Sequence, residues 1–232
     1  MTDTGSFRRA AGYCAITASI LAVASLIVGL AGVNYDFDAF SGAEAILGAG
    51  ADAAPYIRWS LVFNLFGNYF LLIPVAIVLW HALRADSPMT VDFATFAGLL
   101  FLSVGGIASG ILIGIWPDMI VDYASADGAD RDNIATTFVT FTRAIENGIQ
   151  GPVQNLPGAI WLLGMGGFLK RRRNALGWLT LVFGFFMLLN GIGGLAGNAA
   201  LSMIGFSGNF LILPFWAVWT GIDLLRRPLA ET

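Results

Sequence analysis

The chain has 232 residues, of which 57% are hydrophobic and 12% are charged, and its formal net charge is -3. So small a charge, with basic residues only in short clusters, excludes an extended nucleic-acid-binding surface, and we expect no nucleic-acid partner. A single cysteine, Cys14, and a single histidine, His81, exclude an intrachain disulfide and clusters of histidine ligands, so we expect no cofactor and no metal site.

Apolar runs of about 20 residues, the length that crosses ~30 Å of hydrocarbon, recur along the chain. They predict an all-α polytopic membrane protein, a six-helix bundle in a single domain over 1–232, with spans at about 10–33, 59–80, 93–116, 152–169, 176–197 and 208–225. An amphipathic outer helix over 134–150 is expected before the fourth span. Trp59, Trp80, Trp116 and Trp178 lie at predicted span ends, where an indole ring prefers the headgroup level.

Charge is distributed unequally along the six-span path. One side collects the basic residues Arg8, Arg9, Arg84, Lys170, Arg171, Arg172, Arg173, Arg226 and Arg227. The other side holds Asp36, Asp38, Glu44, Asp52, Asp118, Asp122, Asp127, Asp130 and Asp132, with Arg58 and Arg131. The positive-inside rule therefore predicts a multi-pass protein of the plasma membrane with both termini cytoplasmic.

Carboxamide side chains enter three predicted spans in the outer half of the membrane. The residues are Asn64 and Asn68 in the second span, Gln154 and Asn155 in the fourth, and Asn190 in the fifth. Amides supply donors and acceptors without charge. The cluster either bonds helix to helix or lines an outward-facing polar vestibule for a small polar or cationic solute, and the sequence leaves both interpretations open.

The segment 142–157 combines polar residues with helix breakers just before the fourth span. Pro152 and Pro157 lack the backbone donors that would bond the carbonyls of residues 148 and 153, so a bend is predicted where the helix enters the membrane. Arg143 and Gln150 belong to the polar stripe of the amphipathic helix. Arg143 and Glu146 either form a surface ion pair or act at the mouth of the vestibule, with Glu146 as a proton or cation acceptor and Arg143 as an anchor for an anionic group.

Glycines recur every four residues in two spans and form small-residue faces that let helices approach closely. They are Gly106, Gly110 and Gly114 in the third span, and Gly193 and Gly197 in the fifth. These faces serve packing within the bundle or contact with a second copy or a partner subunit, and spacing alone does not separate the two.

Four short motifs, R-R-A-A-G-Y near the start, P-Y-I-R-W-S, I-W-P-D and W-x-x-W-T-G-I-D-L-L-R-R near the end, give the chain a recognisable pattern. The pattern resembles an uncharacterised family of bacterial six-span membrane proteins, known only as a domain of unknown function. The resemblance covers nearly the whole chain and implies a six-span fold, but it brings no activity and no catalytic residues.

Two functions follow as hypotheses. The first is a protein that binds or passes a small polar or cationic solute through the vestibule; the second is an accessory or scaffolding subunit that packs through its glycine faces in the lipid bilayer. No H-E-x-x-H, G-x-S-x-G or P-loop motif occurs, so no catalytic residue is assigned and an enzyme is the least favoured class.

Overall fold

The computed structural model describes residues 3–36 and 42–226, and within them every regular element is a helix. The long helices are α1 (Asp3–Gly32), α4 (Ala54–Asn68), α5 (Ile73–Leu83), α6 (Pro88–Ser125), α7 (Gly128–Arg143), α8 (Gln154–Arg172), α9 (Asn174–Leu195) and α10 (Ala199–Arg226). Shorter pieces are α3 (Ala43–Leu47), η1 (Ala51–Ala53), η2 (Phe70–Leu72) and the π-helical η3 (Ala144–Val153). The predicted all-α class is confirmed.

Five helical stretches of the described chain are long and apolar enough to cross a membrane, which indicates a membrane-embedded protein. They are Gly5–Gly32, Ala51–Leu83, Pro88–Ser125, Asn174–Leu195 and Ala199–Arg226. The remaining predicted span corresponds to α8, which is not one of the five. Its first turn carries Gln154 and Asn155 and its last turn is basic, and both features lower its hydropathy.

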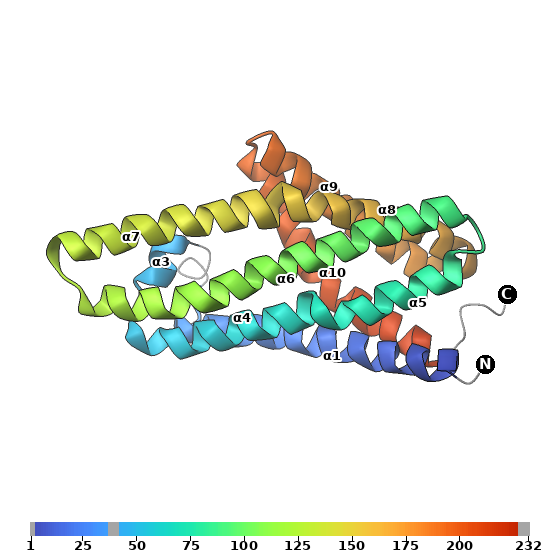
Figure 1. Ribbon diagram of the computed structural model, residues 1–232, viewed down its shortest axis with the longest axis horizontal. Helices are drawn as coiled ribbons and strands as arrows, with labels where there is room; N and C mark the ends of the chain where they lie inside the picture. The colour runs from blue at the N-terminus through green and yellow to red at the C-terminus, as the bar shows by residue number, and fades with distance from the viewer. Residues whose placement is uncertain (1–2, 37–41, 227–232) are drawn as a thin grey trace.

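Helices α1, α4, α6 and α7 lie along the long axis of the molecule, whereas α10 crosses it obliquely, and both chain termini are at one end of that axis (Figure 1). We call this end the terminal end; it also holds the turn between α5 and α6. The opposite, distal end holds the turn between α6 and α7 and the short α3 (Figure 1). Of the residues used in the charge argument, Asp38 and Arg227 lie outside the described residues.

The core at the terminal end of the bundle is built around α8. Trp161 of α8 is 1% exposed and packs against Phe101 of α6 and Trp216 of α10, with ring centroids 6.2 and 5.9 Å apart. A Cβ on Gly98 would lie 2.5 Å from the Trp161 ring, so this glycine is what lets α6 approach α8. The Trp161 ring therefore connects α8 to both α6 and α10.

A second core lies toward the distal end, where α6 continues well past the predicted end of its span at residue 116. Trp116 does not lie at the surface there; it is 6% exposed and packs on Phe138 of α7, with ring centroids 5.6 Å apart. Its Nε1 donates to Thr142 Oγ1 at 2.9 Å. The expected headgroup position of this tryptophan was wrong because α7 packs back along α6 and covers it.

Candidate functional site

The helix break predicted before α8 is present and is stabilised by an amide of the chain itself. Gly151 has φ -72° and ψ -112°, outside the helical region, and Pro152 follows inside η3. The Asn155 side chain then donates from Nδ2 to the carbonyl oxygens of Gln150, at 2.5 Å, and Gly151, at 2.9 Å. Asn155 therefore acts as a cap on the broken turn, and it directs its donor at the backbone.

Beside this break, polar side chains connect α4, α6 and α8. Asn68 Nδ2 donates to Asn64 Oδ1, and Asn64 Nδ2 donates to Ser109 Oγ of α6 at 3.2 Å. The hydroxyl of Tyr69 also hydrogen-bonds Ser109 and accepts a bond from Gln154 Nε2 at 3.2 Å. We call these five residues the polar seam. It brings together three of the amides predicted from sequence.

Two members of the polar seam were not predicted. Ser109 is fully buried and Tyr69 is 7% exposed, yet both lie among apolar and glycine residues of the kind that fill every span. A Cβ on Gly105 would clash with the Tyr69 ring, so the glycine makes room for the tyrosine. A polar residue opposite a glycine on a neighbouring helix is a three-dimensional relation, which the periodicity of one helix does not reveal.

α10 contributes polar groups that the sequence argument also missed. Asn209 Nδ2 donates to Asn155 Oδ1 at 3.4 Å, a long bond that extends the polar contacts of α8 to α10. Asn190 is separate from the other predicted amides: its Oδ1 accepts from Ser202 Oγ of α10 at 2.9 Å. The predicted cluster therefore divides into a group around α8 and one pair between α9 and α10.

Two amide oxygens near α8 have no donor. Gln154 Oε1 and Asn209 Oδ1 are buried and lack a hydrogen-bond partner among the described residues. Gln154 is 6% exposed, and rotating its amide by half a turn would leave the nitrogen unpaired in place of the oxygen. A buried polar atom without a partner in an apolar bundle is unfavourable, so this place suits a water molecule or a polar solute.

The charged residues predicted near the mouth are arranged differently from the simple pair of Arg143 with Glu146. Arg143 Nη2 donates to Glu44 Oε1 at 2.9 Å, and both side chains are more than half exposed. The reason is that α3 packs on α7 and places Glu44 opposite Arg143, whereas Glu146 lies further along the helix, in η3. Gln150 contributes its backbone carbonyl to Asn155 and is half-buried.

Glu146 is exposed on η3 and makes no ion pair within the described part of the chain. Desolvation by the surrounding protein raises the pKa of its carboxyl to about 7. Because the side chain is exposed, water screens the energetic consequence of this shift. The role of Glu146 as a proton or cation acceptor stays a prediction from the sequence.

The predicted packing glycines have three different environments. A Cβ on Gly106 would meet Phe70, and one on Gly193 would meet the backbone of Ser202, so both glycines pack inside the bundle. Gly197 has φ +64° and belongs to the turn that ends α9, a left-handed position that favours glycine. Gly110 and Gly114 face open space on the exposed side of α6.

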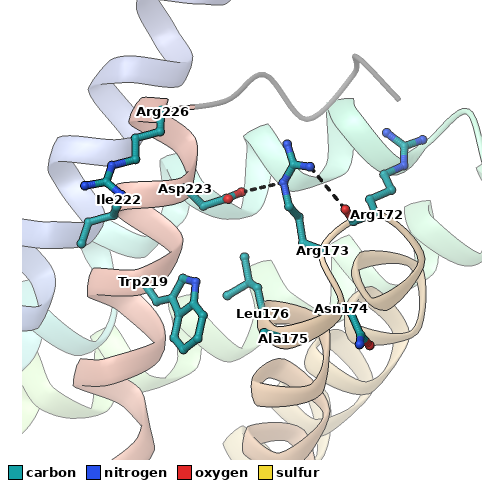
Figure 2. Close-up of a pocket in the computed structure, with 9 residues that line it drawn as sticks. All are labelled: Arg172, Arg173, Asn174, Ala175, Leu176, Trp219, Ile222, Asp223 and Arg226. Atoms are coloured by element: carbon teal, nitrogen blue, oxygen red, sulfur yellow. Dashed lines mark hydrogen bonds and ion pairs between the residues drawn. The ribbon is translucent and has the colours of Figure 1, made fainter.

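Two cavities lie away from the polar seam. An apolar groove of about 500 Å³ lies between α1 and α4, lined by Ile27, Tyr56, Trp59 and their neighbours. A polar cavity of about 420 Å³ lies between the α8–α9 turn and the last turns of α10 (Figure 2). Across residues 3–36 and 42–226, no group of three or more His, Cys, Asp or Glu side chains is placed to hold a metal ion.

Comparison with known proteins finds no match: no family model, no curated protein and no solved structure is similar to this chain.

Proposed function

We propose that the chain is a membrane-embedded binding protein for a small polar or cationic solute, which is held at the polar seam. The observation that carries the proposal is the buried Gln154 Oε1, which has no donor among the described residues. The nitrogens of Asn64, Asn68, Gln154 and Asn155 already donate within the protein. With the Gln154 amide in this orientation, the unpaired buried atom is an acceptor oxygen, which favours a solute that donates hydrogen bonds or carries positive charge.

The distal surface supports the same ligand class. Asp122, Asp127 and Asp130 are exposed there and make no ion pair within the described residues, whereas Glu44 and Asp118 are paired with arginines. Unpaired carboxylates gathered at one end of a bundle raise the local concentration of cations. The acidic loops then attract the solute, and the uncharged acceptors deeper in the bundle bind it. Glu146, with a pKa of about 7, lies between them along the chain.

The test is stabilisation of the purified protein by defined solutes. Ammonium, guanidinium, urea and glycerol, each at low millimolar concentration where none acts as a denaturant or an osmolyte, are compared with acetate, which offers acceptors only, in a thermal unfolding assay in detergent. We expect donor-bearing solutes to raise the Tm of the wild type, and Gln154→Leu to abolish that rise. Asn190→Leu is the matched control, since this amide pairs with Ser202 away from the seam and its loss should leave the solute-induced shift in place. Equal shifts in wild type and Gln154→Leu would sink the proposal.

We further propose that α8 is the fourth of six spans and that both termini face the cytoplasm of a bacterial cell, in keeping with the resemblance to the uncharacterised six-span family. The basic residues of the α8 last turn, Arg84 and Arg226 support this orientation by the positive-inside rule. In a Cys14→Ala background, Ser125→Cys should react with an impermeant maleimide on intact cells, and Asn174→Cys only after permeabilisation. Labelling of both on intact cells contradicts a crossing by α8.

A second candidate function is that of an accessory subunit, and it is favoured by the open environment of Gly110 and Gly114. Glycine in a helix interior lowers stability, and nothing in the described bundle contacts these two positions. Purification at endogenous level in mild detergent tests this candidate. A co-purifying chain that is lost in Gly110→Leu supports it, and a lone monomer in the wild type refutes it.

A further inference from the structure

The polar cavity at the terminal end is built from three structural elements. Arg172 and Arg173 come from the end of α8 and the turn after it, and Asp223 and Arg226 come from the last turns of α10 (Figure 2). Leu176 of α9 closes it on the third side (Figure 2). At about 420 Å³ it has the size of sites that bind small polar groups.

The described side chains that line this cavity include more arginines than carboxylates. Arg173 Nε donates to Asp223 Oδ2 at 3.3 Å, inside the cavity, and both side chains are mostly buried. Arg172 is paired from outside by Asp86, with Nη2 and Oδ1 2.6 Å apart. Among the described residues, the cavity has three arginines against these two carboxylates, and Arg226 makes no ion pair within residues 3–36 and 42–226. Lys170 and Arg171 add to the positive potential in the same turn.

The mouth of the cavity is continuous with an apolar surface. Trp219 and Ile222 line the cavity and are also exposed on the outside of α10. They end a row of exposed apolar residues that recurs every three or four positions along this helix, formed by Leu211, Phe215, Trp219 and Ile222. In a membrane such a row lies against acyl chains. A molecule seated on it would therefore bring its polar end to the arginines.

We propose that this cavity binds the phosphate-bearing headgroup of an anionic phospholipid, whose acyl chains lie along the exposed row of α10. Guanidinium groups suit phosphate because they donate several hydrogen bonds in a planar fork. Basic pockets between helices at a membrane surface are where anionic headgroups bind. A soluble phosphate would gain nothing from Trp219 and Ile222, whereas a lipid uses both parts of the site.

The experiment is native mass spectrometry of the full chain in detergent, with phosphatidylglycerol and phosphatidylcholine of identical acyl chains added at increasing concentration. We expect phosphatidylglycerol to bind more tightly, and Arg226→Gln to weaken it roughly fivefold, the effect of one cation at a membrane surface. Lys170→Gln is the matched control. It removes one charge from the last turn of α8, near the cavity, at a residue that packs on Trp178 and does not line the cavity, so it makes no direct contact with the phosphate. A change below about twofold is therefore expected.

Asp223→Asn separates recognition from loss of structure. It releases Arg173 from its carboxylate partner and should tighten phosphatidylglycerol binding, which a damaged fold does not do. Three results overturn the proposal: equal affinity for the two lipids, unchanged binding in Arg226→Gln, or inorganic phosphate at the lipid concentration displacing phosphatidylglycerol. None of these outcomes depends on Gln154, so the experiment tests the lipid site independently of the proposed solute site.

Discussion

Replacing Asn155 with leucine tests whether the amide at the helix break is structural. Its Nδ2 bonds two carbonyls, those of Gln150 and Gly151, and its Oδ1 accepts a longer bond from Asn209. The side chain is 4% exposed, so leucine has room in the same volume but offers no donor. At about 0.6–1.5 kcal/mol for each of the two short bonds, the loss amounts to about 1–3 kcal/mol.

The assay is thermal unfolding in detergent, where each kcal/mol lowers the Tm by about 2–4 °C in a chain of this length. Asn155→Asp is the companion variant, because aspartate keeps the shape but has no N–H to donate, and it should be at least as destabilised as the leucine variant. Amide hydrogen exchange should also accelerate in η3 and the first turn of α8. If both variants unfold at the wild-type temperature, Asn155 does not cap the break and its amide is available to a ligand.

Three further predictions test other parts of the bundle. Gly105→Ala pushes a methyl group into the aromatic ring packed against it and should destabilise by about 1–3 kcal/mol, whereas Gly110→Ala, which faces open space, should be neutral or slightly stabilising in the same unfolding assay. Trp116→Phe leaves the buried Thr142 hydroxyl without its hydrogen-bond donor and should lower the free energy of unfolding by about 0.5–1.5 kcal/mol. In a double-mutant cycle with Thr142→Val the two losses should be non-additive, and additive losses would show that the hydrogen bond does not contribute. The raised pKa of Glu146 means that the folded state binds its proton more tightly than the unfolded state, so stability should fall as pH rises from about 4.5 to about 7, and Glu146→Gln should remove that slope.

The sequence predicted the helices well because each apolar run reports on its own surroundings. The runs that became α1, α6, α9 and α10 leave half or more of their most apolar stretch unburied by the rest of the chain, and a high hydropathy is what such a surface needs in a membrane. The break at Gly151 and Pro152 was also visible, because proline acts on its own helix. Features that depend on a single helix are the ones that a single sequence can specify.

The contacts between helices were harder to predict. Glu44 pairs with Arg143 across 99 positions of sequence, and Gln154 meets Tyr69 across 85, with no pattern near either residue to indicate its partner. Trp116 was placed at a membrane boundary because a tryptophan at the end of an apolar run is typical of one, yet α7 buries it. Each error arises where a residue that the sequence predicts at the surface packs against another part of the protein instead.

Packing against protein also explains how α8 can carry two buried amides, Gln154 of the polar seam and Asn155. A helix in lipid must be apolar all round, because an unpaired amide there is unfavourable. α8 packs against α6 and α9, and its two amides are buried and meet protein: Tyr69, which follows α4, and Asn209 of α10 provide partners that lipid lacks. The polar groups that weaken its own tendency to enter a membrane are therefore tolerated only in the assembled bundle. It follows that a solute bound at Gln154 would contact a helix whose position depends on its neighbours, and binding there should stabilise the packing of the whole bundle as well as the site.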